Sequence, residues 1–118
     1  MKTIADEEMR QMMTTTKPYC VVILKTGPKW DEPGKEPIMW EHGRRNFALR
    51  AEGLLSIVCP VRDGSGVTGI GIFNASEDAT RVIMDDDPGV QAGIFVYELH
   101  PTRSFPGDML PGDPSPKE

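Results

Sequence analysis

The chain has 118 residues, with 13 lysines and arginines against 18 aspartates and glutamates, and a formal net charge of -5. This length is typical of one compact domain, so we expect a single hydrophobic core. The acidic balance argues against a nucleic-acid partner, because binding to phosphates needs a clustered basic face.

Residues 1 to 18 are expected to form a helical extension ahead of the main domain. Met9, Met12 and Met13 recur at helical spacing after an acidic turn, which predicts a short helix from Ile4 to Met13. Acidic residues stand where a signal peptide would need basic ones, and no apolar run approaches the ~20 residues that span a bilayer. We therefore expect a cytoplasmic protein that does not bind a membrane.

A nearly continuous apolar run from Tyr19 to Thr26 predicts a buried central strand. The following segment, residues 27 to 37, holds three prolines and two glycines and is too irregular for a helix or strand. Long loops in compact domains often cover sites, so we expect a lid in which Trp30 is the apolar anchor and contacts substrate. The alternative is a surface loop held in place by one tryptophan.

A helix is predicted over residues 36 to 52, and Gly53 supplies its C-terminal stop. Trp40, Phe47 and Ala51 fall on one stripe at helical spacing. We expect this stripe to face the core.

Two strands are then predicted, over residues 54 to 60 and 67 to 73, joined by a hairpin turn at residues 63 to 66. In the second strand, Gly69 and Gly71 leave one bare face, which lets a ligand, a helix or a second backbone approach closely. These glycines lack the third glycine and the following helix of a dinucleotide-binding loop, so we do not expect a nucleotide cofactor.

A second helix is predicted to begin at Ser76, a good N-cap residue, and to end before Pro88. Ala79, Val82 and Ile83 would form its buried stripe.

The last strand is predicted over residues 93 to 100, where apolar side chains fill both alternating sets. The main domain should therefore cover residues 19 to 101. The tail, residues 102 to 118, is rich in proline and too poor in apolar residues to fold alone. We expect an arm or a disordered segment there.

The predicted order β-α-β-β-α-β is that of the split β-α-β, or ferredoxin-like, α+β fold, with both helices on one face of an antiparallel sheet. The other face would remain uncovered. Strands this apolar on both sides need a cover, so we expect a second subunit to stack against that face as a homodimer.

The chain has two cysteines, Cys20 and Cys59, each inside an apolar strand. Neither stands in a metal-ligand spacing, so we expect buried, reduced thiols and no bound metal.

His42 and Asp87 are the residues best suited to chemistry. His42 lies away from the predicted core stripe of its helix and shares a face with Asn46, which fits a general acid or base. The alternative is a solvated histidine on the outer face of the helix. Asp87 precedes Pro88, so its carboxylate is also explained as the cap of a short turn. The two roles of Asp87 are compatible, because a capping geometry would also fix the carboxylate against an imidazole.

Several short elements, taken in order, resemble the YCII-related domain family between residues 19 and 101. They are Trp40-Glu41-His42, Glu52-Gly53, Leu54-Leu55, Pro60, Asp87-Pro88 and Ala92-Gly93. The resemblance implies a dimeric α+β barrel with a site formed by the helix histidine, His42, and by Asp87 before the proline. It also implies kinship with lactone isomerases and a dehydrochlorinase of aromatic catabolism. The chain departs from the family in having Cys59 before Pro60, where a glycine is usual.

If the site is catalytic, His42 would move a proton on a small cyclic or aromatic substrate while Asp87 sets its tautomer. Trp40, Asn46 and Trp30 would contact that substrate. This describes a lyase or isomerase that needs no cofactor. The alternative is a non-catalytic dimeric module for ligand binding or an accessory role, which would bind through the pocket between sheet and helices. Such a module needs no titrating pair, so His42 and Asp87 would be more than a hydrogen bond apart with no cavity between them. The sequence leaves open whether the chain is an enzyme.

Overall fold

A computed structural model describes residues 1–112. The chain from Pro18 to Arg103 forms one compact unit, and Met1–Lys17 belongs with the chain from Ser104 onward to another. In the latter, helix α1 spans Asp6–Met13 and leaves all its side chains exposed. The end of the predicted tail, 113–118, lies outside the described residues. None of the described helices combines the length and apolar character needed to cross a membrane.

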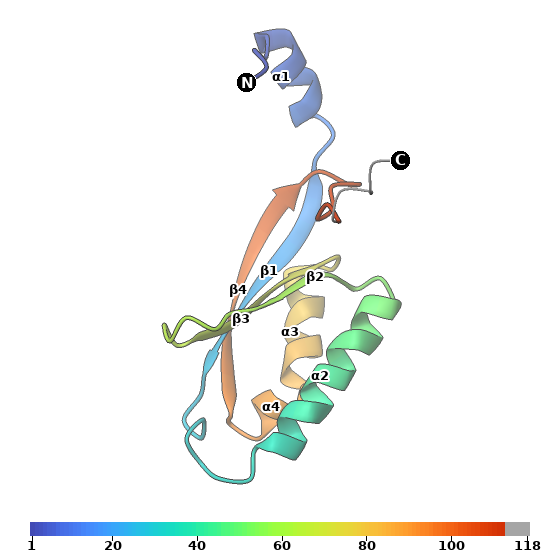
Figure 1. Ribbon diagram of the computed structural model, residues 1–118. Helices are drawn as coiled ribbons and strands as arrows, with labels where there is room; N and C mark the ends of the chain where they lie inside the picture. The colour runs from blue at the N-terminus through green and yellow to red at the C-terminus, as the bar shows by residue number, and fades with distance from the viewer. Residues whose placement is uncertain (113–118) are drawn as a thin grey trace, which may run out of the picture. The chain divides into compact units, whose positions relative to one another are not determined.

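The larger unit contains a four-stranded sheet in the order β2-β3-β1-β4, and β3 pairs antiparallel with both of its neighbours. Helices connect β1 to β2 and β3 to β4, which confirms the predicted ferredoxin-like α+β fold (Figure 1). The strands are β1 Lys17–Thr26, β2 Leu55–Pro60, β3 Val67–Phe73 and β4 Phe95–Ser104; the helices are α2 Glu36–Ala51, α3 Glu77–Asp85 and α4 Pro88–Gln91.

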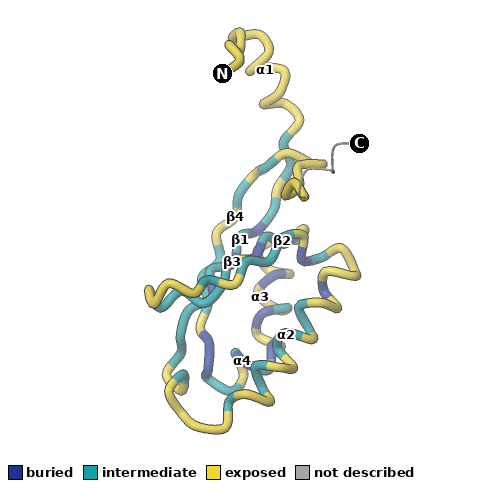
Figure 2. The backbone as a smooth tube through the Cα atoms, viewed as in Figure 1, coloured by how far each residue is buried: buried dark blue, intermediate teal, exposed yellow. Residues whose placement is uncertain are grey.

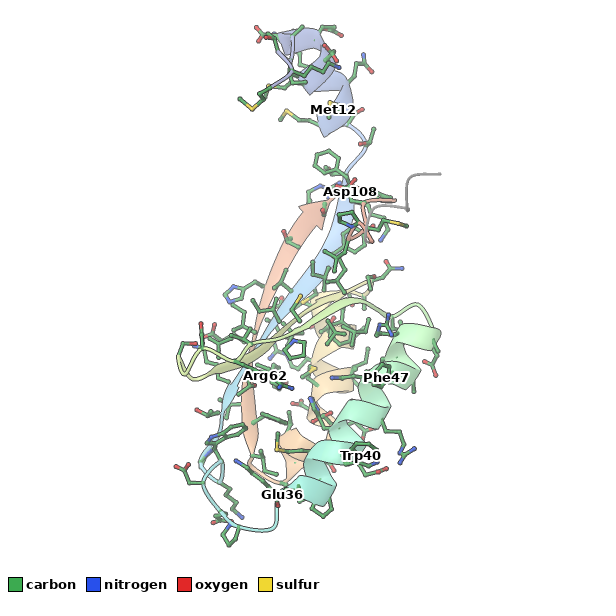
Figure 3. The ribbon with its side chains drawn as sticks, viewed as in Figure 1. Met12, Glu36, Trp40, Phe47, Arg62 and Asp108 are labelled. Carbon is green, nitrogen blue, oxygen red and sulfur yellow. The ribbon has the colours of Figure 1, made fainter. Side chains whose placement is uncertain are left out.

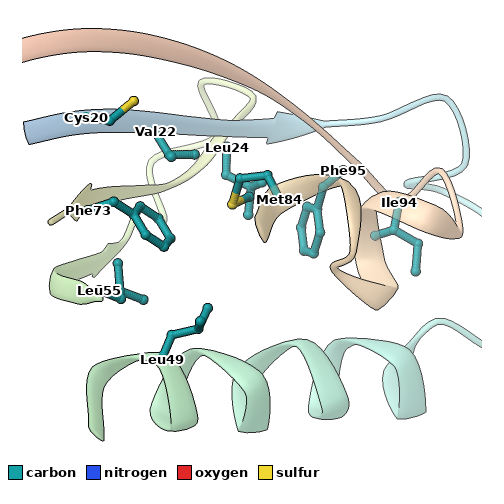
Figure 4. Packing of buried hydrophobic residues seen from close by; sticks show 9 residues of the cluster. All are labelled: Cys20, Val22, Leu24, Leu49, Leu55, Phe73, Met84, Ile94 and Phe95. Carbon is teal, nitrogen blue, oxygen red and sulfur yellow. The ribbon is translucent and has the colours of Figure 1, made fainter. Parts of the chain in front are cut away.

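The helices α2, α3 and α4 cover one face of the sheet (Figures 1 and 2). Along β1, Cys20, Val22 and Leu24 are buried and alternate with residues that are only partly buried. Successive side chains of a strand point to opposite faces, so the buried set faces the helices. Leu49 of α2 points toward this side of the sheet, where the core has formed (Figure 4). The buried core residues are Cys20, Val22, Leu24, Leu49, Leu55, Phe73, Met84, Ile94 and Phe95.

Helix α2 turns a different face to the core from the one predicted. Trp40 and Phe47 are 71% and 69% exposed, whereas Leu49 is buried and Ile38 and Met39 pack against the core (Figure 3). Apolar side chains are spread around this helix, so spacing alone does not select its inner face. The predicted stripe is therefore wrong.

A smaller correction applies to α3. Its predicted stripe included Ala79 and Val82, but both are exposed, and Thr80 and Met84 are the buried residues. The Thr80 hydroxyl donates to the carbonyl of Ser76 at 2.7 Å, which lets a polar residue occupy a buried position.

The last strand runs further than predicted. β4 passes through Pro101 and ends at Ser104 instead of stopping at His100. It is an edge strand, where a residue without a backbone N–H is tolerated. Tyr97 of this strand donates to Asp85 at the end of α3, with 2.5 Å between the oxygens. Burial, helped by this bond, raises the pKa of Tyr97.

The two cysteines differ in exposure. Cys20 on the central strand β1 is fully buried, but Cys59 is only partly buried because it lies near the end of the edge strand β2. The expectation of two buried thiols is therefore wrong for Cys59. Both are free thiols, and β3 separates their strands.

The sheet face opposite the helices carries the alternate residues of each strand. Val21 pairs with Ile72 and Ile23 with Ile70, so these four side chains share that face. Ile70 is 38% exposed and the other three are partly buried. Helices α2, α3 and α4 lie on the other face, so they leave this apolar surface uncovered.

A charged pair joins the two neighbouring strands β1 and β4. The Lys25 ammonium lies 2.5 Å from the Glu98 carboxylate, and His100 lies 3.3 Å from the other oxygen of Glu98. The hydrogen bond from Lys25, followed by that from His100, lowers the pKa of Glu98.

Candidate functional site

A cavity of about 740 Å³ lies between α2 and the helix-facing side of the sheet, a size typical of small-molecule sites. Val22 and Leu24 of β1 line it from the sheet, and His42 and Asn46 line it from α2. Its surface is mainly apolar, with a few polar side chains directed at the space. This composition suits a small organic ligand.

Glycines form part of the cavity floor. Gly71 pairs with Val22 and Gly69 with Leu24, so both glycines lie on the helix-facing side of β3. A Cβ atom at Gly71 would lie 3.1 Å from Cδ1 of Leu55, which would crowd the floor. The bare backbone therefore leaves the space open, in line with the close approach that the glycine pattern suggested.

The structure brings His42 and Asp87 together. Nδ1 of His42 lies 2.8 Å from Oδ1 of Asp87, although 45 residues separate them in the chain. The side chains are 14% and 2% exposed. An ionised carboxylate can only accept, so the proton of this bond belongs to Nδ1. In the neutral ring, Nε2 then carries the lone pair, which accepts from Nδ2 of Asn46 at 3.4 Å and can act as a base once a substrate displaces that contact.

Asp87 also caps α4, as its place before a proline suggested. Oδ2 accepts from the backbone N–H of Gly89 at 2.9 Å and from that of Val90 at 3.2 Å, while Oδ1 faces His42. The two roles are divided between the two oxygens. The backbone of α4 thus holds the carboxylate in place against the imidazole.

Gly89 permits this turn to pack closely. A Cβ atom there would lie 2.5 Å from Cδ2 of Phe95 and 3.1 Å from Oδ2 of Asp87. Phe95 in turn stacks against His42, with ring centroids 4.7 Å apart. The turn, the aromatic ring and the imidazole therefore form one packed group.

Arg45 was not anticipated as part of the site. Its two terminal nitrogens lie 3.8 Å from Oδ1 of Asp87 and 3.8 Å from Oδ2 of Asp86. It follows His42 by three residues on α2, so helical spacing places both on one side. That spacing was the available sequence signal.

Trp30 lines the cavity from the loop between β1 and α2. Its ring lies 5.9 Å from that of Phe95, and the Lys35 ammonium sits 3.6 Å from its centroid. Lys35 also donates to the Trp30 carbonyl at 2.6 Å. The loop is thus anchored at the cavity by its tryptophan.

Of the other two predicted substrate contacts, Asn46 lines the cavity and Trp40 does not. Nδ2 of Asn46 lies 3.4 Å from Nε2 of His42, and both residues line the cavity. Trp40 does not line it, because the inner face of α2 is the one that carries His42, and Trp40 projects from another face. Trp40 is therefore withdrawn as a substrate contact of this cavity.

Two further cavity residues, Arg50 and Arg62, were missed by the sequence reasoning. Neither stands in a motif, and only the folded chain shows that they reach the same space. Within residues 1–112, no three His, Cys, Asp or Glu side chains are grouped so as to hold a metal ion.

The similarity of this chain to known proteins is low. No family model and no curated protein matches the chain. A solved structure of 5-chloro-2-hydroxyhydroquinone dehydrochlorinase (TftG) from Burkholderia phenoliruptrix, in complex with 2,5-dihydroxybenzoquinone, is similar with a TM-score of 0.46 and 18% identity. The similarity covers 69% of this chain and 90% of that one. The fold assignment rests on the strand order and helix placement described above.

Proposed function

We propose that this protein is a homodimeric, YCII-related enzyme that transfers a proton on a small cyclic or aromatic substrate, in the manner of a lyase or isomerase. One observation carries the proposal: His42 lines a cavity while its Nδ1 is held 2.8 Å from the buried carboxylate of Asp87, which also caps α4. An imidazole held in this way is a typical general acid or base.

The proposed chemistry starts at Nε2 of His42. This nitrogen would take a proton from a carbon or oxygen of the substrate, and Asp87 would stabilise the imidazolium that forms. Return of that proton at another atom would complete an isomerisation. Departure of a leaving group with the electron pair of the broken bond would complete an elimination. Asn46, 3.4 Å from Nε2, would help to position the reacting group.

The surroundings of His42 support a ring-shaped substrate. Trp30 and Phe95 offer aromatic surfaces at the cavity, and Gly69 and Gly71 leave its floor flat. Aromatic rings pack well against such surfaces in offset or tilted arrangements.

The alternative of a non-catalytic binding module would require a cavity but no His–Asp contact. The observed His–Asp contact favours the enzyme, whereas the cavity suits both functions. The exposed apolar side of the sheet, with Ile70 in it, supports the homodimer, because soluble monomers rarely leave large apolar patches in water.

The experiment is a proton-exchange screen. A panel of lactones and halogenated hydroquinones would be incubated with the protein in deuterium oxide, with deuterium uptake and product formation followed by NMR. We expect one member to react, and His42→Gln to slow that reaction by a factor of about 10² to 10⁴.

The matched control is His100→Gln, which removes the other histidine of the chain, an exposed residue outside the cavity. This variant should react at the wild-type rate. Wild-type reaction rates in His42→Gln would rule out the proposed base. Binding of panel members without any deuterium uptake or product would favour the binding module.

A further inference from the structure

The charges around the cavity are all of one sign. Arg50 lines it from the last turn of α2. Arg62, labelled in Figure 3, lines it from the connection that follows β2. No aspartate or glutamate of the described chain lines it, and Asp87 contacts His42 without lining it. The ligand space therefore faces two guanidinium groups and no carboxylate.

These two arginines differ from others on the chain. Arg44 and Arg81 pair with glutamates on their own helices, and Arg45 lies near Asp86 and Asp87. By contrast, neither cavity arginine forms an ion pair with any residue in 1–112.

The lack of ion pairs at Arg50 and Arg62 is not caused by a shortage of carboxylates. With a net charge of -5, the chain has enough carboxylates to pair its arginines. The Arg50 guanidinium lies 5.8 Å from the centroid of the Phe47 ring. Its hydrogen-bond donors stay available for a ligand, as do those of Arg62.

We propose that the ligand of this cavity is an anion: a small cyclic or aromatic molecule that carries a carboxylate. The planar fork of a guanidinium matches a carboxylate in geometry and charge. The apolar floor at Gly69 and Gly71 would take the ring, and His42 would face its reactive part. The inference deepens the proposed function, on which it rests for the location of the ligand, but it does not depend on proton transfer.

The test compares two probes of nearly equal shape, 2-naphthoate and its neutral amide, 2-naphthamide, by calorimetry on the full chain. We expect naphthoate to bind about tenfold more tightly, because charge-assisted hydrogen bonds are the stronger ones. Raising the salt concentration should reduce the ratio of the two affinities, since salt screens the attraction between exposed charges.

Variants then assign the preference to residues. Arg62→Gln and Arg50→Gln should each weaken naphthoate binding about threefold, and the double variant, about tenfold weaker for naphthoate, should bind both probes equally. The matched control is Arg44→Gln, which removes the same charge from α2 outside the cavity and should change nothing.

Equal binding of the two probes to the wild-type protein, or binding of neither, overturns the inference without any variant. A preference for naphthoate that survives in the double variant overturns it as well. Naphthoate preference without any deuterium uptake in the substrate screen would overturn proton transfer alone. Deuterium uptake by neutral substrates, without a preference for naphthoate, would overturn the anion inference alone.

Discussion

At the scale of single residues, Asp87 organises the site because each of its oxygens has a separate task. Oδ2 accepts hydrogen bonds from the backbone N–H groups of Gly89 and Val90, and Oδ1 accepts one from Nδ1 of His42. The capping bonds fix the side chain before any ligand binds. The orientation and tautomer of the imidazole therefore follow from a local backbone turn.

This arrangement predicts a tautomer change in Asp87→Asn. Asparagine is also a good N-cap, so its carbonyl oxygen should keep the backbone bonds of α4. Its amide NH₂ would then face Nδ1 of His42, which must become the acceptor, and the ring proton should move to Nε2. Nitrogen–proton correlation spectra of the neutral imidazole would read this directly.

Two controls accompany this measurement. His100, the other histidine, should keep its spectrum in the same sample. Asp86→Asn, which alters the neighbouring exposed carboxylate, should leave His42 unchanged. Retention of the Nδ1–H form of His42 in Asp87→Asn would contradict the assigned hydrogen bond.

At the scale of elements, the short helix α4 packs against α2 and α3 and leads into β4. Asp87 begins it, and Gly89 lets Phe95 pack directly against its first turn. The position of the carboxylate that orients His42 therefore depends on a residue without a side chain.

Gly89→Ala should destabilise the protein by about 1–3 kcal/mol, because the added methyl group would have to displace the Phe95 ring. The free energy of unfolding in urea measures this. Gly43→Ala on α2 is the matched control, since a Cβ there meets nothing within 4 Å. It should stabilise the helix by up to about 1 kcal/mol. Equal effects of the two substitutions would disagree with the packing described.

At the scale of the whole molecule, the uncovered side of the sheet is the feature that calls for a partner. Ile70 and Ile72 of β3 lie there with Val21 and Ile23 of β1, and α2, α3 and α4 lie on the opposite face of the sheet. In a two-fold symmetric dimer both subunits use the same patch of surface. A second copy of this chain can therefore cover the apolar face of the sheet with its own apolar face.

We predict that the protein sediments at twice its chain mass at micromolar concentration. Ile70→Lys should dissociate it, because an unpaired ammonium would be buried in the interface. Val82→Lys, at an exposed apolar position on α3, is the control and should remain a dimer. A wild-type protein that is folded and monomeric would refute the dimer.

The sequence by itself determined the order of helices and strands and, through it, the fold class. Alternating and β-branched runs mark strands such as β3, and glycines and prolines such as Gly53 and Pro88 end the elements between them. These signals act over neighbouring residues, so they are readable without a structure. The order of His42 and Asp87-Pro88, together with the family resemblance, also singled out the pair that the fold brings to 2.8 Å.

Only the tertiary structure decided which face of α2 turns inward. Trp40 and Phe47 made the outer stripe look like the core side, but the contacts of His42 and Arg45 with the acidic turn before α4 accompany the opposite orientation. The cavity, and the place of Arg50 in it, depend on that same orientation. Such choices are set by contacts between residues far apart in the chain, which local spacing does not encode.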